Sequence, residues 1–305
     1  MPSGLSYPAL KCVLEFLEPP KRFLITARSQ SLQRVCKSTT LRVNRLENYE
    51  TGLCLDNFDI GTFRNNAVLL KNEKNKRQVV NQAPSHLIQK EVVEKVKEFY
   101  MSGKLCVNQA SFEKDYPENP FSLPSNFQLK TNNLDTPYVY FDHILSKIDS
   151  TCFPLNSLTI DIEEPVSLIH PVINSARYLE VFVPSSSQII KFPNIHVLPN
   201  KNVVFFNSNC GLDDLVGIIR YWAEHGRETG TDYFFAPCEF FATDDRLHGL
   251  DEVFAEFRSD HGDEQPESPR LSIPIINSTS KINVYGNQRR SWASRGILMK
   301  VEQTE

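Results

Sequence analysis

Glycine is scarce in this chain, and its scarcity excludes the common nucleotide-binding motifs. The 305 residues include 12 glycines, none of which stands in GxxxxGK or GxGxxG spacing. Those motifs need glycine because backbone amides must approach a phosphate closely. A GxSxG nucleophile elbow is absent as well. We therefore expect no cofactor and no enzyme of these classes.

Paired cysteines and closely spaced histidines are missing too. Seven cysteines stand singly without a CxxC pair, and seven histidines form no HxxxH or HExxH pattern. Reduced, mostly buried thiols are the simplest interpretation, and a local zinc site has no support. Asp260, His261, Asp263 and Glu264 lie close together in the sequence but lack the spacing of a calcium-binding loop. We expect a polar loop there, with metal binding as the alternative.

The chain also lacks a basic leader, a long apolar run and an excess of cations. Lys11 and Glu15 interrupt the first apolar stretch, so we expect neither a secretion signal nor a membrane span. A net charge of -4 predicts no general affinity for nucleic acid. These features favour an intracellular protein, cytoplasmic or nuclear, and the sequon at Asn277 is then a chance match.

Hydrophobic residues make up 40% of the chain and charged residues 23%, which is typical of a folded globular protein. Apolar residues at helical spacing predict a helix over 7–17, and Pro19-Pro20 is expected to end it. Shorter helices are predicted over 21–28 and, with Ser31 as its cap, over 31–37. The N-terminus should therefore form a helical head.

Antiparallel strands are predicted next, over 39–44 and 52–58, followed by a helix over 91–100 that Gly103 ends. The basic tract 71–77 has no apolar periodicity and is placed at an exposed hairpin tip, with an anion contact as the alternative. Proline, asparagine and serine enrich 113–137, which indicates a long irregular connection.

Strands and helices then alternate, as in parallel sheets joined by right-handed crossovers. Strands are expected over 155–162, 178–183, 202–207 and 232–237, and helices over 165–176, 212–225 and 247–257. Strands at 271–276, 281–285 and 297–301 should be antiparallel. The fold class is thus mixed α+β and α/β: a helical head, an antiparallel meander, a largely parallel sheet of weakly leucine-rich-repeat-like character, and antiparallel C-terminal strands.

Two places carry residue types that catalysis uses. Asp161, Glu163 and Glu164 follow a predicted strand, where α/β enzymes often place acids, but ordinary helix-start chemistry explains them as well. Cys210 precedes a predicted helix whose N-terminus would lower the pKa of its thiol. A buried, inert cysteine is the more common outcome.

Residues 5–22 read LSYPALKCVLEFLEPPKR, and several later stretches carry matching motifs. These later stretches are YWAEHGRETGT at 221–231, NSTS at 277–280, VYG at 284–286 and MKV at 299–301. In these residues the chain resembles a nematode-expanded family of uncharacterised F-box-like proteins, in which an F-box-like N-terminus precedes an F-box-associated domain of unknown function.

The resemblance implies a non-enzymatic substrate-recognition subunit of a ubiquitin ligase, which binds a Skp-type adaptor and an unknown target protein. A stand-alone protein-binding module and an enzyme with a dispersed site are the alternatives. The predicted parts are 1–38 (F-box-like), 39–112 (antiparallel strands plus helix), 113–137 (irregular connection) and 138–305 (α/β domain). An apolar helical face would enter the adaptor's groove, or pack on the chain's own second domain. Its residues are Leu5, Pro8, Leu10, Val13, Leu14 and Leu17.

Overall fold

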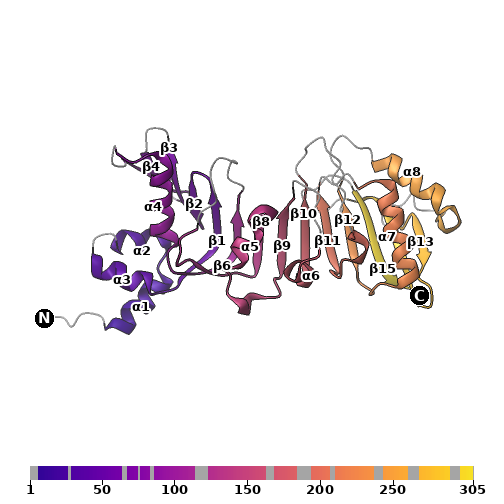
Figure 1. Cartoon of the computed structure of the whole chain (residues 1–305), viewed down its shortest axis with the longest axis horizontal. Helices are drawn as coiled ribbons and strands as arrows, with labels where there is room; N and C mark the ends of the chain where they lie inside the picture. Colours follow the sequence, from indigo (N-terminus) through magenta and orange to yellow (C-terminus); the bar gives the residue numbers. More distant parts are fainter. Residues whose placement is uncertain are drawn as a thin grey trace. The chain divides into compact units, whose positions relative to one another are not determined.

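The chain divides into two compact units, Met1–Cys152 and Phe153–Glu305. Figure 1 shows the elements of each. The sequence patterns place the start of the predicted α/β domain at residue 138 rather than at 153. The structure, a computed structural model, describes residues 6–26, 29–63, 67–74, 76–82, 86–113, 123–162, 168–183, 194–206, 210–236, 243–259, 268–288 and 296–304.

Three short helices open unit 1, as predicted. They are α1 (Tyr7–Phe16), α2 (Pro19–Thr26) and α3 (Gln30–Lys37). α1 ends at Phe16, before Pro19-Pro20, as predicted. The same two prolines also begin α2, because proline fits a first turn whose amides have no intrahelical partner. The cap of α3 is Ser29 rather than Ser31, with Leu32 N donating to Ser29 Oγ at 3.5 Å.

The sheet of unit 1 combines a meander with parallel strands. The predicted antiparallel meander is confirmed, and the basic tract lies at its last hairpin. β6 then pairs in parallel with β1, and β7 and β8 pair in parallel with β6. The strands are β1 (Leu41–Tyr49), β2 (Gly52–Leu55), β3 (Phe58–Phe63), β4 (Ala67–Asn72), β5 (Arg77–Gln82), β6 (Lys104–Phe112), β7 (Gln128–Lys130) and β8 (Asn133–Pro137).

Two features of unit 1 position the sites described below. The predicted internal helix is α4 (Gln89–Met101), which packs on β2 and β3. β7 and β8 lie within 113–137, so the described part of that stretch is not an irregular connection but contributes two strands to the sheet. The short helix α5 (Phe141–Leu145) follows β8, and Leu129 of β7 then forms a parallel bridge with Ile148.

Unit 2 contains the predicted parallel sheet with antiparallel C-terminal strands. Neighbouring strands run β9-β10-β11-β12 in parallel, and β15, β14 and β13 follow in antiparallel pairing. The strands are β9 (Ser157–Asp161), β10 (Tyr178–Phe182), β11 (Asn202–Phe206), β12 (Asp232–Phe235), β13 (Leu271–Pro274), β14 (Ser280–Gln288) and β15 (Gly296–Gln303). The continuous apolar run of β11 is buried from Val203 to Phe206, as expected of a strand covered on both faces.

The observed bounds of the helices in unit 2 match the predicted bounds in one case and differ in two. The helix α7 (Leu212–His225) is confirmed, and Asp214 Oδ2 accepts from Gly211 N at 2.9 Å at its start. Of the helix expected over 165–176, the described residues from 168 on form only α6 (Pro171–Ser175), and α8 (Thr243–Val253) starts earlier than predicted. In the part of the chain that is described, every helix is too short or too polar to cross a bilayer.

Candidate functional site

A buried arginine holds the helical head together. Arg22 of α2 is 2% exposed, and its guanidinium donates to four backbone carbonyls and one thiol. The acceptors are Leu14 O at 3.1 Å, Thr40 O at 2.9 Å, Cys36 O at 2.8 Å, Thr39 O at 2.6 Å and Cys36 Sγ at 3.0 Å. All five N–H groups of the side chain are therefore used.

The position of these carbonyls explains why a cation belongs there. Leu14 lies in the last turn of α1 and Cys36 in the last turn of α3. The carbonyls of a last turn have no intrahelical partner and carry the negative end of the helix dipole. One guanidinium therefore satisfies two helix C-termini and ties both to the segment that enters β1.

The residues of the face predicted to bind an adaptor differ in solvent exposure: some are buried and others are exposed. Leu14 is 1% exposed and belongs to the core of unit 1, where α1 packs against β1 and α3. Leu10 and Leu17 are half-buried, whereas Pro8 and Val13 are exposed. Leu5 lies outside the described residues. The leucine stripe thus faces the rest of the head more than it faces solvent.

A second set of apolar side chains on the head is exposed, and of these only Val13 belongs to the face predicted to bind an adaptor. Phe16 at the end of α1 is 73% exposed, and Leu24 on α2 is 60% exposed. Tyr7, Val13 and Ile25 are exposed as well. Helical geometry separates Phe16 from the leucine stripe and places it on the side of Val13, which is the signal that could have identified it.

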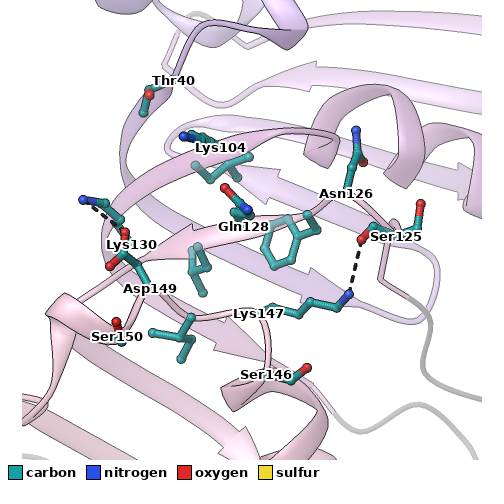
Figure 2. A pocket seen from close by; sticks show the side chains of 14 residues that line it. Thr40, Lys104, Ser125, Asn126, Gln128, Lys130, Ser146, Lys147, Asp149 and Ser150 are labelled. Atoms are coloured by element: carbon teal, nitrogen blue, oxygen red, sulfur yellow. Dashed lines mark hydrogen bonds and ion pairs between the residues drawn. The ribbon is translucent and has the colours of Figure 1, made fainter.

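Unit 1 also contains a polar hollow of about 580 Å³ beside β6 and β7 (Figure 2). Its floor is apolar, with Leu105, Phe127, Leu129 and Ile148 all buried. Its rim consists of polar and charged side chains from the starts and ends of several elements. These are Thr40, Lys104, Ser125, Asn126, Gln128, Lys130, Ser146, Lys147, Asp149 and Ser150.

Positive charge predominates at this rim. Lys130 Nζ lies 3.2 Å from Asp149 Oδ2, and Lys147 Nζ donates to Ser125 O at 3.4 Å. A hydrogen bond from the Thr151 hydroxyl, then one from its backbone amide, lowers the pKa of Asp149 to about 2. Asp149 is therefore ionised at neutral pH, and the described lining of the hollow contains three ammonium groups and one carboxylate.

The residues considered for catalysis do not form a reactive group in the described structure. Burial, followed by the nearby charge of Asp214, raises the pKa of the Cys210 thiol, which opposes the thiolate that a nucleophile needs. Asp161 lies at the end of β9, whereas Glu163 and Glu164 lie outside the described residues, as does the loop 260–264. Within the described ranges, no three histidine, cysteine or acidic side chains form a group suited to a metal ion.

Comparison with protein-family models finds a match over part of the chain. No curated protein and no solved structure matches the chain. The match runs from the first turn of α4 to just beyond β12, so it includes most of the polar hollow and excludes the helical head. Over residues 89–239, the chain is similar to the family described as a domain of unknown function (DUF3557).

Proposed function

We propose that this chain is a non-enzymatic protein-interaction protein whose helical head binds a partner protein. More specifically, we propose that the partner is a Skp-type adaptor of a cullin ubiquitin ligase. The rest of the chain would then select a target protein. The observation that carries the proposal is the set of exposed apolar side chains on α1 and α2. Tyr7, Val13, Phe16, Leu24 and Ile25 define this set, which we call the head patch.

The support is energetic. A large apolar side chain left in water forgoes about 1.5–3 kcal/mol of burial free energy, so several on two short helices favour an interaction surface. Arg22 fixes the C-terminal end of α1 through Leu14 O, two residues before Phe16, which lowers the entropy that a partner would have to remove there. The F-box-like character of the head rests on the sequence resemblance and is part of the proposal.

Co-purification tests it. The full chain, expressed with a Skp-type adaptor, should retain the adaptor, and Phe16→Asp should abolish retention because a carboxylate enters the apolar contact. Val139→Asp is the matched control: Val139 is 68% exposed, also in unit 1, and outside the head. Leu14→Asp is unsuitable, because a buried charge would unfold the head itself. No retention by the unmodified chain would refute adaptor binding.

Two alternatives give different results. A stand-alone binding module would ignore the adaptor yet capture another protein, again in a manner that depends on Phe16. An enzyme would need a site assembled from dispersed residues, and Cys210, with a raised thiol pKa, is a poor nucleophile for it. The leucine-rich-repeat-like character of unit 2 stays a prediction, supported by four parallel neighbouring strands.

A further inference from the structure

The described side chains that line the polar hollow of unit 1 carry an excess of positive charge. Three lysines, Lys104, Lys130 and Lys147, line the hollow together with one carboxylate, Asp149, and only Lys130 pairs with that carboxylate. Among the residues that the structure describes, no carboxylate lies within ion-pair distance of Lys104 or Lys147. Two ammonium groups are therefore available to a ligand, in a chain whose net charge is -4.

The lysines reach the hollow from different directions. Lys104 begins β6, Lys130 ends β7, and Lys147 follows α5. Figure 2 shows the amino groups of Lys104 and Lys130 on one side of the hollow, and that of Lys147 on the opposite side, close to Ser125. Cations at two sides suit a ligand with more than one anionic group.

The backbone beneath these lysines is fixed by hydrogen bonds. Gln128 N donates to Gly103 O at 2.9 Å, Leu129 N to Lys147 O at 2.9 Å, and Asp149 N to Leu129 O at 2.8 Å. The buried floor residues hold the same segments from below. A ligand would therefore find the donors already in place, and the entropy cost of ordering them would be small.

The chemistry of the rim selects the kind of ligand. Besides the ammonium groups, Gln128 and Asn126 present amide N–H groups, and Ser125 and Ser150 are available as hydroxyl donors. Anionic oxygens accept from all of these groups. Because most rim side chains are exposed, a small molecule would bury little surface here, whereas an extended chain with several charges could contact both sides.

We propose that the hollow binds an acidic peptide segment of a partner protein, through carboxylate or phosphoryl oxygens on Lys104 and Lys147. This site lies outside the head patch and does not depend on adaptor binding. The segment's anionic groups would act as counter-ions for the two lysines, to which the described residues supply none, and the Asp149 carboxylate would repel part of that negative charge.

Fluorescence anisotropy with labelled peptides tests the inference on the full chain. One short peptide is rich in glutamate, a second carries phosphoserine at the same positions, and a third carries lysine. We expect saturable binding of the first two and none of the third. The tighter of the two acidic peptides identifies the source of the anionic oxygens.

Variants locate the binding. Lys104→Gln with Lys147→Gln should weaken it about fivefold to tenfold, as the loss of two exposed charge contacts predicts. Lys37→Gln with Lys90→Gln removes the same charge from exposed positions elsewhere in unit 1 and should change little. Asp149→Asn should tighten binding about twofold to fivefold, because a repulsive carboxylate is removed.

Any of three results would overturn the proposal. The first is the absence of saturable binding by both acidic peptides. The second is equal weakening by the two double variants, which would indicate general attraction to a polyanion. The third is tighter binding of a single-stranded oligonucleotide than of either peptide. Phe16→Asp should bind the acidic peptides as the unmodified chain does, which separates this site from the head patch.

Discussion

Replacing Arg22 with methionine would test how the helical head is held. Methionine keeps an unbranched apolar stem but deletes the guanidinium and its four bonds to backbone carbonyls. At about 1 kcal/mol for each net hydrogen bond, the loss is about 4 kcal/mol. This is a large part of the 5–15 kcal/mol (roughly) that stabilises a typical domain. Arg22→Lys should lose about half as much, because an ammonium group has three donors at one point.

Hydrogen exchange of the backbone amides in 7–40 is the suitable measurement. Both tryptophans, Trp222 and Trp292, belong to unit 2, so tryptophan fluorescence does not report on the head. A loss of about 4 kcal/mol should accelerate exchange of the protected head amides by about three orders of magnitude. Amides of α7 in unit 2 serve as an internal reference in the same experiment.

Lys21→Met is the matched control for Arg22→Met. Lys21 is the neighbouring basic residue, it is exposed, and it pairs only with Glu18 at 2.9 Å among the described contacts. Such a pair contributes less than about 1 kcal/mol. If exchange in the head were equally fast in the two variants, or unchanged in both, the role assigned to the guanidinium would be refuted.

Further predictions concern the sheet of unit 1 and use urea denaturation followed by far-ultraviolet circular dichroism. Gly103→Ala should destabilise the unit by more than about 1 kcal/mol, because Gly103 has a φ of +102° and an added Cβ would lie 2.8 Å from Lys37 O; an unchanged midpoint would contradict this. Burial raises the pKa of Asp135, which accepts from Ser111 Oγ at 2.9 Å, so the fold favours the neutral carboxyl and loses stability as pH rises through the raised pKa. Asp135→Asn should therefore stabilise the protein at a pH of about 7 more than at a pH of about 4. Asp149→Asn replaces a carboxyl of lowered pKa, so it should destabilise the protein at a pH of about 7 and not at a pH of about 2. The same pH trend in both variants would refute these two pKa assignments.

Local sequence patterns predicted an element correctly where the hydrophobic periodicity of that segment alone was distinctive. The apolar run of β11 and the stripe of α7 were predicted at nearly their observed bounds, because burial on both faces or on one face leaves a distinct periodicity. The hairpin tip was confirmed for the same reason, with Lys71 paired to Glu73 at the turn.

Local patterns failed where distant pairing or a single proline decided the outcome. β7 and β8 form because they pair with β6, and their own residues show no sequence pattern typical of a strand. The helix expected over 165–176 contains Pro171 in its interior. Proline lacks the amide that an interior turn needs and fits a first turn, so the described helix begins there.

The candidate sites were harder to find than the fold. Lys104, Lys130 and Lys147 are far apart in the sequence, and only the parallel pairing of β6 and β7 brings the first two together. For the head, apolar spacing correctly found a helix, but it selected Leu14, which the core uses, and missed the exposed Phe16. A hydrophobic stripe marks the buried side of a helix more reliably than it marks a binding face.

The most direct test of the proposed function is a calorimetric titration of the purified chain with a purified Skp-type adaptor. We expect saturable one-to-one binding that Phe16→Asp weakens more than about tenfold, while Val139→Asp binds as the unmodified chain does. Absence of binding by the unmodified chain, or equal affinity of the two variants, would contradict this expectation.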